Sequence, residues 1–192
     1  MRIISGSLKG RRLKTPRWDG LRPTSDRLRE TLFNILAPRV AGARVLDGYA
    51  GTGAVGLEAH SRGAAEVVFV ERDPRAAALI SENLAHCGVT SGCAIMRADI
   101  GRLRDPFGAR GFDLILLDPP YAEPDLEAVV ARAGAWLAAG GLLVLEHARR
   151  RAAPLVVADL TRTRLVPSGD SALSFYERTA AGPGPDGSLA DR

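Results

Sequence analysis

Five short runs of apolar residues, spaced by alanine-rich amphipathic segments, constrain the fold of this chain more than any other feature. The apolar runs lie at residues 44–47, 66–70, 93–97, 112–117 and 142–146. The amphipathic segments lie at residues 54–62, 74–87, 125–138 and 148–158. Alternating strands and helices are typical of βαβ units, and near-continuous apolar strands indicate a sheet covered on both faces. We predict an α/β fold with a doubly wound, mostly parallel, Rossmann-like sheet.

The C-terminal part departs from this alternation. Runs at residues 161–166 and 171–177 flank Pro167-Ser168-Gly169-Asp170, a turn sequence that predicts a hairpin and therefore an antiparallel edge to the sheet. Residues 180–192 contain glycines and prolines but few apolar side chains, which predicts a disordered tail.

The N-terminal part carries most of the positive charge. Residues 1–44 contain eleven Lys and Arg against three Asp and Glu, although the whole chain has a net charge of only +4. A polyanion bound by this part would explain the asymmetry, and a solvated basic face would explain it equally well.

Local patterns suggest how that basic segment folds. Residues 2–15 alternate around two glycines and predict a basic hairpin or extended arm. Thr24 or Ser25 can cap a helix that ends before Pro38. We therefore divide the chain into a basic N-terminal hairpin and helix (1–40), a main domain (41–179) and the tail (180–192).

Several classes of protein are disfavoured by composition. No apolar stretch approaches the length of about 20 residues that a membrane helix needs, and the N-terminus lacks the core of a signal peptide. We expect a cytoplasmic protein that contacts no membrane. The cysteines and histidines are scattered without metal-ligand spacing, so we expect no metal; they are Cys87, Cys93, His60, His86 and His147.

A glycine-rich loop follows the first predicted strand. Gly51, Gly53 and Gly56 spell GxGxxG before a helix, and Glu71 stands twenty residues beyond Gly51 at the end of the second strand. Glycines let the backbone approach a ligand closely, and a carboxylate at that strand end can accept both hydroxyl protons of a ribose. The sequence therefore predicts a nucleoside-containing cofactor.

Asp47, which stands just before this loop, indicates which cofactor to expect. A carboxylate there would repel a pyrophosphate and attract an ammonium group. S-adenosylmethionine carries an ammonium and a sulfonium but no phosphate, so Asp47 favours this methyl donor over NAD; the alternative is an Asp47 that merely caps the turn. Asp99, after the third strand, could accept from the adenine amino group or could cap a helix.

The fourth strand ends in Asp118-Pro119-Pro120-Tyr121. Two prolines hold the backbone extended and remove two amide donors. The Asp118 carboxylate and the Pro119 carbonyl can then each accept a proton of an exocyclic amine, while the Tyr121 ring offers a face for a planar base. The alternative is a proline turn that only ends a buried strand.

In this order, the glycine-rich loop, Glu71 and the Asp-Pro-Pro-Tyr motif resemble class I S-adenosylmethionine-dependent methyltransferases that act on amines. The N-terminal segment narrows the resemblance to the bacterial 16S ribosomal RNA guanine-N2 methyltransferase family, the RsmD type. The matching segments are Arg2-Ile3-Ile4-Ser5-Gly6, Lys9-Gly10-Arg11 and Leu21 to Leu36. The resemblance extends from residue 2 to about 178 and implies a seven-stranded methyltransferase sheet with a basic N-terminal extension.

The family resemblance also implies a function for individual residues. The reaction would be methyl transfer from S-adenosylmethionine to the N2 amine of one guanine of 16S rRNA, within the assembling 30S subunit, and leaves S-adenosylhomocysteine; we expect a monomer. The residues expected to hold the flipped-out guanine are Asp118, Pro119, Pro120 and Tyr121. Those expected to bind the donor are Arg22, Thr24, Asp47, Gly51, Gly53, Glu71, Arg72, Asp99 and Ile100. Those expected to contact RNA phosphates are Arg2, Lys9, Arg11, Arg12 and Lys14.

Three other functions remain open at this stage. Adenine-N6 methylation of DNA or RNA would use the same tetrapeptide, because that motif does not separate the two purines. A nicotinamide-dependent oxidoreductase would use the literal GxGxxG, and a non-catalytic RNA-binding module would need only the basic segment.

Overall fold

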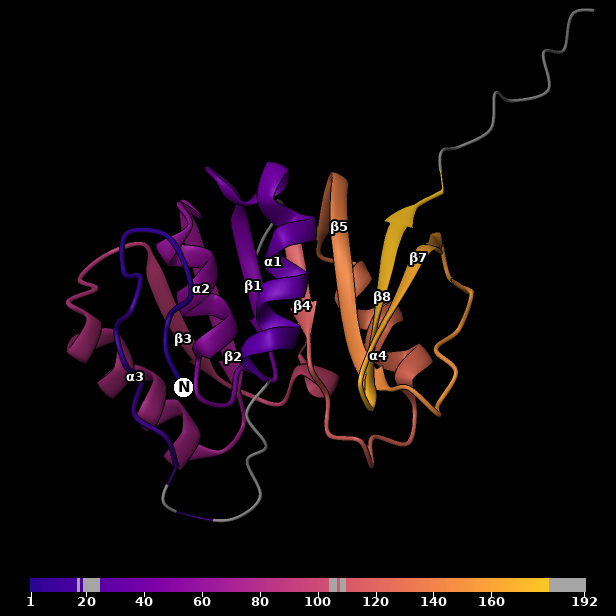
Figure 1. Cartoon of the computed structure of the whole chain (residues 1–192). Helices are drawn as coiled ribbons and strands as arrows, with labels where there is room; N and C mark the ends of the chain where they lie inside the picture. Colours follow the sequence, from indigo (N-terminus) through magenta and orange to yellow (C-terminus); the bar gives the residue numbers. More distant parts are fainter. Residues whose placement is uncertain (17, 19–24, 104–106, 108–109, 180–192) are drawn as a thin grey trace, which may run out of the picture.

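A single mixed sheet organises the chain in the computed structural model, which describes residues 1–16, 18, 25–103, 107 and 110–179 (Figure 1). Within these residues the sheet has eight strands in the order β3-β2-β1-β4-β5-β8-β7-β6. The first five strands are mutually parallel, and the last three pair antiparallel. The bounds are β1 Arg44–Gly48, β2 Glu66–Glu71, β3 Cys93–Arg97, β4 Phe112–Leu117, β5 Leu137–Ala148, β6 Val156–Val157, β7 Leu160–Ser168 and β8 Ser171–Arg178. The α/β fold with an antiparallel C-terminal edge is confirmed.

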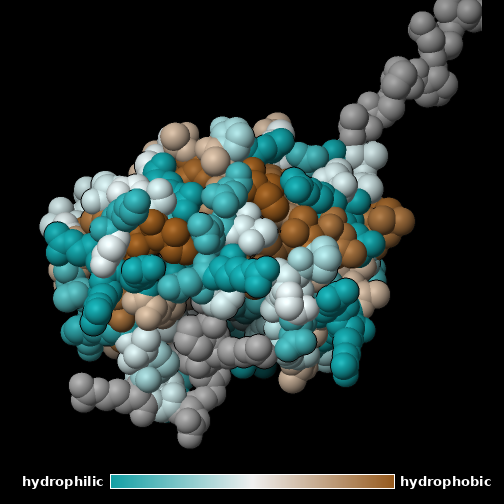
Figure 2. Space-filling model, in the orientation of Figure 1, coloured by the Kyte–Doolittle hydropathy of each residue, from teal (hydrophilic) through white to brown (hydrophobic). Residues whose placement is uncertain are grey.

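Helices cover both faces of this sheet. They are α1 (Asp26–Val40), α2 (Ala54–Ser61), α3 (Pro74–Cys87), α4 (Leu126–Gly134) and the 3-10 turn η1 (Ile100–Arg102). Side chains of β1 alternate between the faces: Val45 packs in the cluster that contains α1, α2 and α3, whereas Leu46 packs in the one that contains α4 and η1. Figure 1 shows α1 and α2 in front of the sheet, and Figure 2 shows hydrophilic side chains on this face with hydrophobic patches between them. Two apolar layers thus enclose the sheet.

The first helix begins as predicted but ends later. Ser25 caps α1, since its side chain accepts a hydrogen bond from the Leu28 amide over 3.2 Å. The prediction that the helix ends before Pro38 is wrong, because the helix continues to Val40. A proline in the last turn removes few backbone hydrogen bonds, and the extra residues bury Val40, which is 1% exposed.

The N-terminal segment, predicted to be a hairpin or an extended arm, folds back on itself with an antiparallel bridge between Arg2 and Arg12 and is fixed to α2. Its two limbs are joined by backbone hydrogen bonds: the Ile3 amide donates to the Arg11 carbonyl and the Gly10 amide to the Ile3 carbonyl, both over 2.9 Å. The buried Glu58 carboxylate of α2 accepts from the amides of Ile4 and Ser5 over 2.8 and 3.0 Å. Because buried polar groups need such partners, these bonds set where the arm lies.

A second polar side chain connects the arm to the glycine-rich loop. Asn83 of α3 is buried, and its Oδ1 accepts from the Lys14 amide over 2.8 Å. Its Nδ2 donates to the Thr52 carbonyl over 3.0 Å. The arm and the loop are therefore held by one amide group.

Two helix predictions in the C-terminal half are wrong. The helix expected over 125–138 ends at Gly134, where a Cβ would lie 2.4 Å from Leu160 Cδ1, and β5 begins at Leu137 instead of 142. No helix forms over 148–158 in the described chain. Pro154 interrupts that segment, and its carbonyl accepts from the hydroxyl of the buried Tyr176 over 2.8 Å. The segment instead contributes the short strand β6, so the sheet has eight strands within the described residues where seven were expected.

The C-terminal hairpin forms as predicted, with slightly longer strands. Ser168 pairs with Ser171, which leaves Gly169 and Asp170 as the turn, and Gly169 has φ of 61°. Residues 180–192, predicted to be a disordered tail, lie outside the described residues. None of the helices in the described part of the chain combines the length and apolarity needed to cross a bilayer.

Candidate active site

A cavity of about 740 Å³ opens at the carboxyl edge of the parallel strands. Ligands of open α/β sheets bind at this edge, where the strand order reverses between β1 and β4. The glycine-rich loop, the strand-end acids, the Asp-Pro-Pro-Tyr motif, the start of α1 and the β7–β8 turn all contribute to its wall. Segments that are far apart in the sequence therefore meet in one chamber.

The glycine-rich loop adopts a backbone that only glycine allows easily. Gly51 and Gly53 have φ of 55° and 76°, and Gly53 is the N-cap of α2. A Cβ on Gly56 would lie 2.3 Å from the Phe69 ring of β2, so Gly56 lets the helix approach the sheet. Two of the three glycines shape the loop, and the third serves packing.

Glu71 fixes this loop from the end of β2. Its Oε2 accepts from the Gly51 amide and its Oε1 from the Asp73 amide, each over 2.8 Å. The residue is 9% exposed and lines the cavity. A carboxylate has about four lone-pair sites, so two backbone bonds leave room for hydroxyl donors of a ribose.

Asp47 lies deeper in the same wall. It is 3% exposed, and its Oδ2 accepts from the Gly56 amide over 2.7 Å. Burial raises the pKa of Asp47 well above its usual value, and the neighbouring Asp118 and Glu71 raise it further. A bound cation would relieve this repulsion, which suits an ammonium group and does not suit a pyrophosphate.

The third acid, Asp99, caps η1. Its Oδ1 accepts from the Gly101 amide over 2.9 Å, which is the helix-capping alternative, yet the residue also lines the cavity. Ile100 is buried beside it, and Arg72 lines the opening next to Glu71. A Cβ on Gly48 would lie 2.6 Å from Ile100 Cδ1, so Ile100 occupies the space that a larger side chain would need.

The Asp-Pro-Pro-Tyr motif closes the cavity on the β4 side. The Asp118 amide donates to the Gly48 carbonyl over 3.4 Å, Pro119 is buried and Pro120 is exposed. Tyr121 is 39% exposed, and its hydroxyl forms a hydrogen bond of 2.7 Å with Ser171 Oγ. The motif thus presents a carboxylate and an aromatic ring to the same space.

The cavity residues that were not predicted include two that are hydrogen-bonded to each other, Glu146 near the C-terminal end of β5 and Ser171 at the start of β8. Ser171 Oγ donates to Glu146 Oε1 over 3.0 Å, so Tyr121, Ser171 and Glu146 form one chain of hydrogen bonds. Glu146 ends an apolar run just as Glu71 does, and that pattern could have revealed it. Ser171 carries no comparable signal.

The cavity mouth holds a further aromatic side chain that sequence reasoning missed. Trp18 lines the cavity, and the Arg75 guanidinium at the start of α3 lies 5.1 Å from the centre of its ring. Arg75 also pairs with Asp73 over 2.8 Å. The predicted donor residues Arg22 and Thr24, which flank this region in the sequence, lie outside the described residues.

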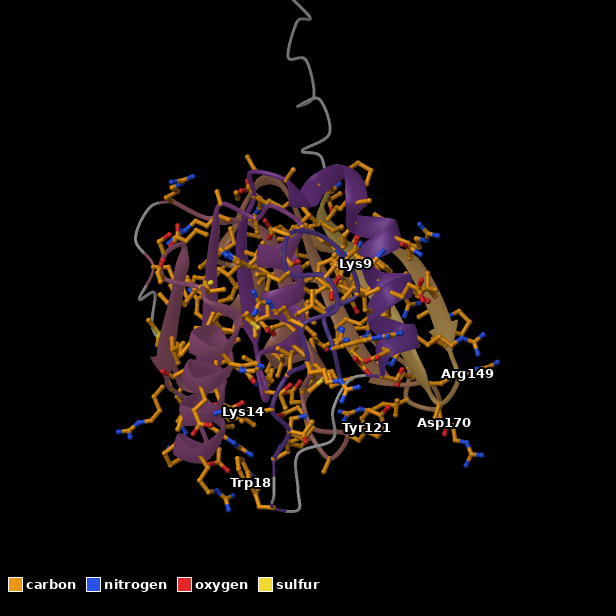
Figure 3. The ribbon with its side chains drawn as sticks, turned by 60° about the vertical axis from the view of Figure 1, so that its left-hand side comes forward. Lys9, Lys14, Trp18, Tyr121, Arg149 and Asp170 are labelled. Atoms are coloured by element: carbon orange, nitrogen blue, oxygen red, sulfur yellow. The ribbon has the colours of Figure 1, made fainter. Side chains whose placement is uncertain are left out.

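The predicted RNA-contacting residues lie along the arm and do not line the cavity. Arg2, Lys9, Arg11 and Arg12 are exposed, and Lys14 pairs with Glu82 over 3.0 Å. Figure 3 shows Lys9 well away from Tyr121. Arg149 and Arg150, which were not predicted, are exposed, and the Arg149 amide donates over 2.7 Å to the carbonyl of Asp170, which lines the cavity.

Comparison with known proteins decides the family. The family described as "Conserved hypothetical protein 95" matches residues 1–177. The chain belongs to this family. It is 38% identical to YlbH of Bacillus subtilis over 182 residues, covering 93% of this chain and 99% of that one. It is 35% identical to the Escherichia coli protein named Ribosomal RNA small subunit methyltransferase D over 184 residues, covering 95% and 92%.

The fold agrees with this family assignment. The solved structure of yhhF from Escherichia coli superimposes with a TM-score of 0.79 at 36% identity, covering 94% of this chain and 98% of that one. The RsmD/YlbH membership suggested by the sequence motifs is therefore confirmed, and the chain has the Rossmann-like sheet of class I methyltransferases.

Proposed function

We propose that this protein methylates the N2 amine of a guanine in small-subunit ribosomal RNA, with S-adenosylmethionine as the donor. The observation that carries the proposal is the shared cavity: Glu71 and Asp47 line it together with Asp118 and Tyr121. A donor bound by the first pair and a base held by the second pair would meet across a few ångströms.

The donor half of the cavity fits S-adenosylmethionine. The Glu71 carboxylate suits the ribose hydroxyls, and the buried Asp47 suits the ammonium of the methionine end. Asp99, Arg72 and Ile100 line the remaining wall, where the adenine is expected. When bound, the cofactor supplies a methyl group activated by a sulfonium.

The acceptor half fits an aromatic amine. The lone pair of such an amine is delocalised into the ring, so the amine is a poor nucleophile. The Asp118 carboxylate and the Pro119 carbonyl accept the two amine protons, which favours a pyramidal nitrogen and directs its lone pair towards the donor. Tyr121 stacks on the base and sets its plane.

Alignment supplies most of the rate acceleration in this scheme. Holding two reactants in line can contribute about 7–11 kcal/mol, so the site needs no dedicated strong base. The Asp118 carboxylate, already hydrogen-bonded to the amine, can accept the proton that the product loses. The base must first leave its stack, which costs a few kcal/mol unless the RNA presents it unstacked.

Ribosomal RNA is the proposed substrate because of the family and the charge. The E. coli relative is named for the small-subunit RNA. The exposed cations of the arm, Lys9, Arg11 and Arg12, are available for phosphates, which give affinity with little sequence information.

Three substrates in parallel test the proposal. Purified protein is incubated with labelled S-adenosylmethionine and with 30S subunits, free 16S rRNA or duplex DNA, and the products are digested to nucleosides. We expect N2-methylguanosine from ribosomal RNA and no label in DNA. N6-methyladenosine as the sole product would overturn the guanine assignment, and NADH binding without binding of S-adenosylhomocysteine would overturn the donor.

A further inference from the structure

We infer that Glu146 selects guanine over adenine, by accepting a hydrogen bond from the ring N1–H while Asp118 and the Pro119 carbonyl hold the neighbouring amine. The inference rests on the proposed function and adds the residue that determines its base specificity. The Asp-Pro-Pro-Tyr motif alone cannot make this choice, since both purines carry an exocyclic amine.

Sheet register places Glu146 beside Asp118. Strands β4 and β5 are parallel neighbours, and their last paired residues are Leu117 and Leu145. Asp118 follows the last residue of β4, Glu146 is the next residue of β5, and both line the cavity. Since side chains alternate along strands, the two carboxylates share the face that carries Leu116 and Val144, under the first turn of α1.

The hairpin fixes the orientation of Glu146. Its pairing partner on β8 is Leu173, and Ser171 lies two residues earlier on the same face. Ser171 Oγ donates to Glu146 Oε1, and a hydroxyl has only one proton. The 2.7 Å bond between Ser171 and Tyr121 must then be donated by the Tyr121 hydroxyl.

This chain of hydrogen bonds links the residue that stacks on the base, Tyr121, to the residue that recognises its ring nitrogen, Glu146. Tyr121 sets the plane of the base, and Glu146 lies at the other end of the same chain, 9% exposed. A side chain that is held and largely buried discriminates more strongly than a mobile one, because a wrong partner cannot be accommodated by rotation or by water.

The hydrogen-bonding edges of the bases supply the selectivity. In guanine the ring nitrogen next to the 2-amine carries a proton, so amine and N1–H form two adjacent donors. In adenine the ring nitrogen next to the 6-amine is a lone pair, and cytosine has the same arrangement. A carboxylate accepts from N1–H but is repelled by a lone pair, so two adjacent acceptor groups fit guanine alone.

The test uses a base that keeps the 2-amine of guanine but lacks the proton on the ring nitrogen N1. 2-Aminopurine has a 2-amine but a lone pair at N1. Small subunits are reconstituted with 16S rRNA that carries guanine or 2-aminopurine at the position that the wild-type protein methylates, and kcat/KM is measured for both. We expect the wild type to prefer guanine by at least about tenfold, the discrimination typical of one good base contact.

The variant Glu146→Gln should reduce that preference by about tenfold, because its amide can donate to the lone pair of 2-aminopurine. Glu177→Gln, on β8 and paired with Arg39 on the surface, is the matched control and should leave the preference unchanged. Ser171→Ala should reduce the preference partially, and Ser171→Thr, which retains the hydroxyl, should restore it.

Other outcomes distinguish failure of the role inferred for Glu146 from failure of the proposed guanine methylation. If Glu146→Gln lowers kcat/KM equally for both bases while its melting temperature and affinity for S-adenosylhomocysteine match the wild type, Glu146 does not read N1–H, although guanine methylation stands. If Glu146→Gln does not fold, an unchanged preference in folded Ser171→Ala overturns the inference. If the wild type methylates adenine, the proposed function and the inference both fail.

Discussion

Gly51 donates its backbone N–H to the Glu71 carboxylate across 2.8 Å, and this bond joins the loop that follows β1 to the last residue of β2. The acid that is proposed to bind the donor ribose therefore also shapes the loop that surrounds it. Since Glu71 accepts from Asp73 as well, the donor half of the cavity is organised before any ligand binds.

Glu71→Gln should therefore impair both donor binding and stability. An amide retains one acceptor but brings N–H groups towards a backbone donor, and an unsatisfied buried group costs about 1–3 kcal/mol. We expect affinity for S-adenosylhomocysteine to fall roughly tenfold or more by calorimetry, which corresponds to one such contact, and the melting temperature to drop. Glu66→Gln, at the opposite end of β2 and paired with the partly buried Arg44, should bind S-adenosylhomocysteine normally.

Asp118→Asn should impair turnover and spare donor binding. The amide keeps an acceptor oxygen but loses the negative charge that favours a pyramidal amine. Loss of one preorganised transition-state contact typically lowers kcat about 100-fold or more. Single-turnover methylation of 30S subunits measures the loss, and an equal fall in affinity for S-adenosylhomocysteine would contradict the division of the cavity.

The raised pKa of Asp47 predicts a pH-dependent affinity. Burial favours its neutral form, whereas the ammonium of the donor favours the carboxylate, so binding should release a proton. Affinity for S-adenosylhomocysteine should rise with pH upwards from the usual aspartate range near about pH 4. Calorimetry in buffers of different ionisation enthalpy detects the proton, and Asp47→Asn should remove the pH slope while Asp113→Asn, on the exposed side of β4, retains it.

His147 predicts how stability changes with acid. Burial lowers the pKa of His147, whose ring bonds to Ala148 O over 3.0 Å and Ser174 Oγ over 2.9 Å. The unfolded chain then binds more protons, so the stability due to the neutral ring is complete above the unfolded pKa near about 6.5. It is lost as the pH falls through the folded value. In urea unfolding, the free energy of unfolding of His147→Gln should fall less steeply as the pH is lowered. The variant of the exposed His86, His86→Gln, should follow the wild type.

The two basic groups predict different effects on RNA binding. Arg149 and Arg150 are exposed near the cavity, whereas Lys9, Arg11 and Arg12 lie along the arm. Removing a cation that binds one phosphate should reduce the salt dependence of binding by about one in log–log slope. Filter binding at several salt concentrations checks this for the double variant Arg149→Ala/Arg150→Ala and for a triple arm variant. An unchanged salt dependence of RNA binding in the arm variant would show that the arm does not contact the RNA phosphates.

Local sequence patterns predicted much of the fold, and they also predicted the glycine-rich loop, the strand-end acids and the Asp-Pro-Pro-Tyr motif of the cavity. The central strands β1, β2 and β4 are largely buried on both faces, so their apolar runs are easily recognised, and the acids Glu71 and Asp118 follow directly after two of these runs. The glycines of the loop were equally informative, because positive φ at Gly51 and Gly53 excludes most other residues.

The features that were missed depend on tertiary pairing. Ser171 reaches Glu146 only because β5 and β8 pair in one particular register, which no local pattern encodes. The same is true of β6, where pairing of Val157 with Leu160 and the contact of Pro154 with Tyr176 replace the expected helix. Pro38 was interpreted as a stop signal, although burial of Val40 extends the helix beyond it.

Glu58 has a practical consequence for anyone who wishes to engineer this enzyme. Its carboxylate accepts hydrogen bonds from the amides of Ile4 and Ser5, so the arm will not keep its position if it is moved to another protein without α2. A chimaera that takes the arm to another scaffold must also carry a glutamate at the matching point of α2. A fusion joined at Met1 needs a spacer long enough to leave those two amides in place.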